Sequence, residues 1–108
     1  MNLKNKNCIP CEGGVPALTK DQAKKLLSEL HEDWYVTEDP MVLSREYKFK
    51  NFAEALDFVN KLGAIAEEEN HHPDIILKWG FVHINLWTHA IGGLSENDFI
   101  LAAKVDSL

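Results

Sequence analysis

The feature that most restricts the fold is the sequence Asn70-His71-His72-Pro73, which separates two different hydrophobic patterns. Apolar side chains before it recur at helical spacing, whereas those after it form the short segments typical of strands. Proline has no backbone N–H group and disfavours the α conformation of the residue before it. We therefore predict that a long helix ends here and that an extended strand begins.

The segment that follows the proline has the pattern of a β-hairpin. Strands are predicted over Asp74–Lys78 and Val82–Thr88, joined by a tight turn at Trp79-Gly80-Phe81. In the second strand, one set of alternate residues is strictly apolar and is expected to face the helices. That set consists of Val82, Ile84 and Leu86.

The hairpin brings distant histidines together. In an antiparallel pair, residues at equal distance from the turn face each other. Counting outward from the central glycine of the turn places Pro73 opposite Trp87, and His71 opposite Thr88 or His89. The two adjacent histidines at the start of one strand and the third at the end of the next should therefore share one site. A histidine cluster suits proton transfer, because imidazole titrates close to neutral pH.

The N-terminal part of the chain divides into an arm and a helix. Residues 1–17 are polar and contain glycine and proline, so we predict an extended arm that precedes a single domain over residues 18–108. Thr19 with Gln22 has the spacing of a capping box, which predicts a first helix over Lys20–His31.

The remaining elements complete the fold prediction. Residues Trp34–Glu38 and Met41–Lys50 are predicted to form a first hairpin, Asn51 caps the long helix that ends at Glu69, and Ser95 caps a last helix. The order α-β-β-α-β-β-α contains no parallel crossover unit. It predicts an α+β domain with a four-stranded antiparallel sheet and helices packed on one face.

Composition and charge exclude several classes of function. With 108 residues the chain forms one domain, and its 45% hydrophobic and 26% charged residues are those of an ordinary globular protein. The formal charge of −6 and the scattered lysines argue against a nucleic-acid partner. No apolar run is long enough to cross a membrane, and no apolar stretch follows the first lysines as in a secretory signal. We therefore predict a cytoplasmic protein.

The two cysteines, Cys8 and Cys11, form a Cys-x-x-Cys sequence. This spacing is half of a zinc site or a redox pair, and no further cysteine supplies the other half. We favour reduced thiols in a loose arm. A metal shared between subunits, or with a histidine, remains the alternative.

Three motifs resemble the pterin-4a-carbinolamine dehydratase family. They are Glu-x-x-Asn-His-His-Pro-Asp at residues 67–74, Val-His-Ile-x-Leu-x-Thr-His at 82–89, and Gly-Leu-Ser-x-x-Asp at 93–98. The resemblance runs from about Leu18 to Val105. It implies dehydration of 4a-hydroxytetrahydropterin, left by aromatic amino acid hydroxylases, to the quinonoid dihydropterin. It also implies that no cofactor or metal is needed and that the protein is a homotetramer built as a dimer of dimers.

The resemblance also assigns roles to residues. His71 and His89 would be the proton-transfer pair, and His72 the histidine that binds substrate beside them. Glu67 would hold the amino-pyrimidine edge of the pterin, since a carboxylate can accept two hydrogen bonds. The full set implied for substrate binding is Glu67, Asn70, Pro73, Trp87 and Thr88. Two of these depart from the family pattern: Asn70 stands where an aspartate is often found, and Trp87 replaces a small residue.

Other interpretations of the same residues stay open. His71, His72 and His89 with Glu67 could form a metal site, although adjacent residues entering a strand point to opposite faces. His83 lies in mid-strand and is expected to be structural. Animal members of the family also act as dimerisation cofactors of a transcription factor, and the wide apolar stripe of the second helix could serve either a homotetramer or a foreign helix.

Overall fold

The computed structural model describes residues 3–9 and 16–108 of the chain. Its helices are α1 (Lys20–Leu27), α2 (Phe52–Glu69) and α3 (Glu96–Val105). Its strands are β1 (Tyr35–Val36), β2 (Leu43–Lys48), β3 (Asp74–Lys78) and β4 (Phe81–Leu86), and two short 3-10 helices are η1 (Leu3–Asn5) and η2 (His89–Ile91). The predicted order of helices and strands is confirmed. None of the described helices is long and apolar enough to cross a membrane.

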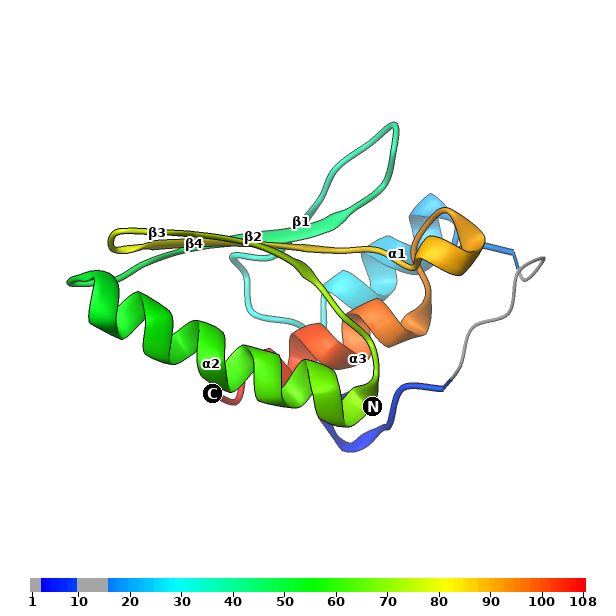
Figure 1. Ribbon diagram of the computed structural model, residues 1–108. Coiled ribbons are helices and arrows are strands. Elements are labelled where there is room, and N and C mark those ends of the chain that lie inside the picture. Colours follow the sequence, from blue (N-terminus) through cyan, green and yellow to red (C-terminus); the bar gives the residue numbers. More distant parts are fainter. Residues whose placement is uncertain (1–2, 10–15) are drawn as a thin grey trace.

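The four strands form one antiparallel sheet in the order β1-β2-β4-β3. Helices α2 and α3 lie beneath the same face of this sheet (Figure 1), as the α+β prediction requires. The inward side chains of β4 are the predicted ones, because Val82, Ile84 and Leu86 are all at most 1% exposed. They pack with Phe99 of α3 and Leu62 of α2 in the core. Burial of this apolar set is what holds the helices on the sheet.

The predicted register of the second hairpin is wrong by one residue. The turn contains only Trp79 and Gly80, and Phe81 already pairs with Lys78 in the ladder. Two-residue loops are the commonest hairpin connections, and they require positive φ, which Gly80 supplies at +66°. A side chain at this glycine would also meet the carbonyl oxygen of Phe49 at 2.9 Å.

Several predicted elements end earlier in the structure. The first helix stops at Leu27 instead of His31, and strands β1 and β2 are shorter than the pattern suggested. The reason is tertiary: the side chain of Asp106 at the end of α3 accepts hydrogen bonds from the His31 backbone and from the Trp34 indole, at 2.9 and 2.7 Å. These contacts hold residues 28–34 in turns. Strand β4 likewise ends at Leu86.

Residues 3–9 pack against the domain and are not the loose segment that the sequence suggested. Leu3 is 3% exposed and belongs to the hydrophobic core, and η1 lies against α3. Cys8 is half-buried with a free thiol, and burial raises the pKa of this thiol to about 12. Cys11 lies outside the described residues, so the predicted role of the cysteine pair stays a prediction.

Candidate active site

A cavity of about 380 Å³ opens where α2 ends, β3 begins and β4 leaves the sheet. It is lined by Asn70, His71, His72, Trp87, Thr88, His89 and Ala90. The structure therefore brings together the three histidines of the predicted site and three of its predicted binding residues. Pro73 and Glu67 do not line the cavity. A larger hollow of about 500 Å³ lies beside α1 and β1, but no histidine faces it.

The end of α2 aims His71 at this cavity. Asn70 is the helix C-cap and adopts the left-handed conformation, with φ of 52° and ψ of 40°. Asparagine tolerates this conformation better than most residues, which gives Asn70 a backbone role. The backbone N–H of His71 then donates to the carbonyl of Ala66 at 3.2 Å. The chain thus turns sharply before the proline and carries both histidines away from the helix axis.

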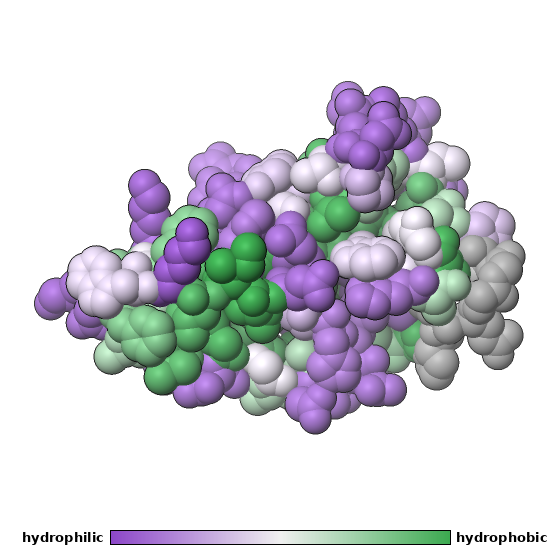
Figure 2. Space-filling view, turned by 45° about the horizontal axis from the view of Figure 1, so that its top comes forward, coloured by the Kyte–Doolittle hydropathy of each residue, from purple (hydrophilic) through white to green (hydrophobic). Residues whose placement is uncertain are grey.

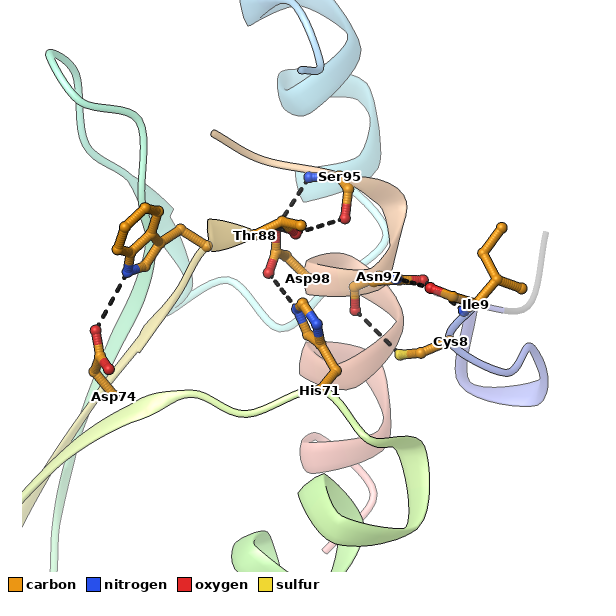
Figure 3. Close-up of polar contacts among 9 residues, drawn as sticks. Cys8, Ile9, His71, Asp74, Thr88, Ser95, Asn97 and Asp98 are labelled. Atoms are coloured by element: carbon orange, nitrogen blue, oxygen red, sulfur yellow. Dashed lines mark hydrogen bonds and ion pairs between the residues drawn. The ribbon is translucent and has the colours of Figure 1, made fainter. Parts of the chain in front are cut away.

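The imidazole of His71 is held by a buried carboxylate. Its Nε2 lies 2.6 Å from Oδ1 of Asp98. The other oxygen, Oδ2, accepts from the hydroxyl of Thr88 at 2.9 Å and from the backbone N–H of Ser95 at 3.0 Å. Figure 3 shows these contacts converging on Asp98 from three directions. Asp98 is fully buried, whereas the side chain of His71 keeps 13% exposure, so only the histidine can reach a ligand.

Asp98 is the residue beside the histidine cavity that the predicted set of site residues did not include. It is the last residue of the Gly-Leu-Ser-x-x-Asp motif, and its local role is visible there as the partner of Ser95 in a capping box. Capping-box carboxylates usually lie at the surface, so nothing local indicated burial beneath His71. Asn70 stands where relatives often have an aspartate, and the acidic partner of His71 comes instead from Asp98 in α3.

His72 and Glu67 form a second, exposed pair. Nε2 of His72 contacts Oε2 of Glu67, and the side chains are 53% and 78% exposed. The two adjacent histidines thus have different carboxylate partners. Among residues 3–9 and 16–108, no three His, Cys, Asp or Glu side chains are grouped to hold a metal ion. The alternative of one metal bound by both histidines therefore lacks a suitable arrangement.

His89 lines the cavity from a different element, at the start of η2. Its ring packs on that of Trp87, with ring centroids 3.9 Å apart and planes inclined by 34°. The indole Nε1 of Trp87 donates to Oδ2 of Asp74 at 3.3 Å. Thr88, which separates Trp87 and His89 in the sequence, leaves the sheet ladder and pairs with Gly93. This bridge closes the loop that presents His89.

His83 is outside the cavity. It pairs with Glu46 across strands β2 and β4, on the sheet face that α2 and α3 leave uncovered. Its Nε2 lies 3.3 Å from Oε2 of Glu46, close enough for an ion pair, although the angles do not make a hydrogen bond. The position agrees with the predicted separation of His83 from the histidine cluster.

Comparisons with known proteins point to one family, the pterin dehydratases. The family model described as "Pterin 4 alpha carbinolamine dehydratase" matches residues 16–108. A Rickettsia canadensis protein, named a candidate pterin-4-alpha-carbinolamine dehydratase, is 56% identical over 105 residues, covering 97% of this chain and 95% of its own. A Brucella melitensis crystal structure, described as a transcriptional coactivator/pterin dehydratase, has a TM-score of 0.79 at 28% identity, covering 84% of this chain and 96% of its own. A pterin dehydratase-like RuBisCO assembly factor has a TM-score of 0.62 at 29% identity, covering 71% and 89%.

Proposed function

The chain belongs to the pterin 4 alpha carbinolamine dehydratase family, and we propose that it converts 4a-hydroxytetrahydropterin to quinonoid dihydropterin and water. The observation that carries this proposal is the single cavity in which His71, His72 and His89 meet. A cavity of about 380 Å³ is in the range of small-molecule sites. Its polar groups are suited to proton transfer, which is all that this dehydration requires.

The proposed reaction moves two protons. The 4a-hydroxyl gains a proton and leaves as water, while N5 of the pterin loses one and the C4a–N5 double bond forms. An ionised Asp98 can only accept, so Nε2 of His71 would donate to it, and the neutral tautomer would keep Nδ1 as the proton acceptor. We assign His71 as the base for the N5 proton and His89 as the acid for the departing hydroxyl.

His72 and Glu67 are proposed to bind the pterin. Both side chains are more than half exposed and already contact each other. A carboxylate at this position can accept two hydrogen bonds from the amino-pyrimidine edge. Thr88 is buried and bound to Asp98, so its role would be to support His71. Trp87 would offer its ring as a stacking surface beside His89.

We also propose that the protein recycles pterin for an aromatic amino acid hydroxylase and works as a homo-oligomer. Strand β3 is an edge strand, and its central residue Ile76 is 46% exposed. Asp74 and Lys78 lie at equal distances from Ile76, so two antiparallel copies of β3 would pair opposite charges. Figure 2 shows apolar side chains gathered on the part of the surface that carries the β3–β4 hairpin. On α2, Phe52 and Leu56 are also exposed and suit a second contact between dimers.

A second candidate function is protein binding, because the similar Brucella melitensis protein is also described as a transcriptional coactivator. The exposed apolar side chains of Phe52 and Leu56 on α2 are the feature that favours it. This role would not use the histidine cavity. A variant such as His71→Ala would slow dehydration and leave any such binding intact.

The deciding experiment is a dehydration assay on freshly generated 4a-hydroxytetrahydropterin. We expect the wild-type protein to accelerate loss of water, and His71→Ala and His89→Ala each to lower the rate by about 10²–10⁴, the usual contribution of a positioned acid or base. His83→Ala is the matched control, since it removes a histidine outside the cavity. Wild-type protein that gave no acceleration would refute the proposed function. Full activity of both cavity variants would refute the assignment of the residues.

A further inference from the structure

We propose that the N-terminal segment 3–9 holds the His71–Asp98 pair in place, with Asn97 as the positioning residue that transmits its effect. This inference deepens the proposed dehydratase function and rests on it. It concerns a part of the chain that lies outside the cavity: neither this segment nor Asn97 lines it. The segment can act on the pair because it joins the two helix ends that carry His71 and Asp98.

The two partners of the pair come from different helix ends. His71 follows the C-terminus of α2, and Asp98 lies in the first turn of α3. Their contact of 2.6 Å therefore depends on how the end of α2 is placed relative to the start of α3. Because a displacement of about 1 Å in a reacting geometry can cost about 100-fold in rate, this placement has to be fixed by further contacts.

Successive backbone groups of the N-terminal segment bind both helix ends. The N–H of Cys8 donates to Oε1 of Glu69 at 2.7 Å, and Glu69 is the last residue of α2. The N–H of the next residue, Ile9, donates to Oδ1 of Asn97 at 3.0 Å. The amide nitrogen of Asn97 donates back to the Ile9 carbonyl at 2.5 Å. Cys8 and Ile9 thus join Glu69 to Asn97. Glu69 lies two positions before His71, and Asn97 is next to Asp98.

The side chains that bind the segment are buried, and further contacts attach it along its length. Asn97 is 4% exposed, and the side chain of Glu69 is 6% exposed. Lys104 of α3 donates to the carbonyl of Lys4 at 2.9 Å and lies 3.7 Å from Glu69. Leu3 anchors the start of the segment in the core. Hydrogen bonds to buried groups are costly to lose, so these contacts resist local displacement.

Neighbouring positions on a helix point in directions about 100° apart, which explains how Asn97 and Asp98 serve different partners. Figure 3 shows Asn97 turned toward Ile9 and Cys8, and Asp98 turned toward His71 and Thr88. The thiol of Cys8 donates to the Asn97 carbonyl at 3.6 Å. A movement of the segment would rotate or shift this first turn of α3, and with it the carboxylate.

The test compares Asn97→Ala with Lys6→Ala. Lys6 lies on the same segment and pairs with Glu96 at the surface, so its removal leaves the Cys8 and Ile9 contacts in place. We expect Asn97→Ala to lower kcat by about 10- to 100-fold with little change in KM, because Asn97 does not line the cavity. Lys6→Ala should keep the wild-type kcat. A folded Asn97→Ala variant with the wild-type kcat would overturn the proposal.

A second readout does not depend on turnover. The ¹⁵N NMR signals of the His71 ring report which nitrogen carries the proton and how it is hydrogen-bonded. Asn97→Ala should move these signals toward those of Asp98→Asn, whereas a purely structural role would lower the melting temperature and leave them unchanged. If wild-type protein failed to dehydrate the pterin, the proposed function would fail, and the ring signals would still decide whether the segment positions His71.

A matched pair guards against misfolding of Asn97→Ala. Glu69→Gln keeps an oxygen that accepts from the Cys8 N–H, whereas Glu69→Ala removes it, and both variants lose the ion pair with Lys104. We expect the alanine variant to shift the His71 ring signals and to lower kcat more than the glutamine variant does. Equal behaviour of the two variants would contradict the proposal.

Discussion

Replacement of the buried carboxylate, Asp98→Asn, is the sharpest test of how the cavity works. The substitution keeps the size of the side chain and removes its charge. The amide oxygen can still accept from Thr88 or Ser95, but the NH₂ group must then face Nε2 of His71. A donor there forces Nε2 to accept and moves the ring proton to Nδ1. His71 would then lose the nitrogen that is proposed to act as the base.

The expected loss follows from these contacts. A hydrogen bond to a charged group contributes about 1.5–3 kcal/mol, and each 1.36 kcal/mol in the barrier is about tenfold in rate. Loss of the charge-assisted bond alone therefore predicts a fall in kcat of about 10- to 150-fold. Loss of the correct tautomer adds to it, up to the roughly 10²–10⁴ that a general base supplies. KM should change little, because Asp98 is 0% exposed and cannot touch the substrate.

The assay is steady-state dehydration, with urea unfolding measured on the same preparations. The free energy of unfolding should fall by no more than about 1–3 kcal/mol, the cost of one unsatisfied buried group. Glu96→Gln is the control, because it makes the same chemical change in the same helical turn, at an exposed side chain that pairs with Lys6 at the surface. A folded Asp98→Asn variant that kept more than about a tenth of wild-type kcat would refute the proposed role of the carboxylate.

Three further predictions use other parts of the structure. His72→Ala should raise KM with little change in kcat, because His72 is proposed to bind the substrate and the transition state equally well. A loss of kcat with unchanged KM in steady-state assays would contradict this. Ile76→Glu should lower the molar mass measured by light scattering, since it places like charges at the centre of the proposed β3 contact; an unchanged assembly would count against that contact. Cys8 should react with iodoacetamide at pH 8 more slowly in folded than in urea-unfolded protein, because burial raises the pKa of its thiol to about 12. Because folding raises this pKa, Cys8 should stabilise the folded state below about pH 9, and this stabilisation should be lost as pH rises toward 12. In alkaline unfolding curves, the Cys8→Ala variant should lack this pH-dependent loss of stability.

Local patterns along the chain were enough to predict the elements and the meeting of the histidines. Helical spacing up to Glu69, the break at Pro73 and the alternation around Ile84 are local patterns, and each is set by backbone geometry within a few residues. A hairpin brings the two ends of its strands together whatever the details of its turn. His71, His72 and His89 therefore line one cavity despite a register error of one residue, which arose from the length of the turn.

Other contacts are encoded by no local pattern and form only when the whole chain packs. Asp98 lies 27 residues after His71, and its burial depends on how α3 packs under the sheet. Segment 3–9 looked featureless because its binding groups are backbone N–H and C=O groups, which every sequence possesses. Its partners, Glu69 and Asn97, are ordinary polar residues until folding brings them within hydrogen-bond distance of two consecutive backbone N–H groups. Long-range placement of this kind results from packing of the whole core, so it can be read only from the folded chain.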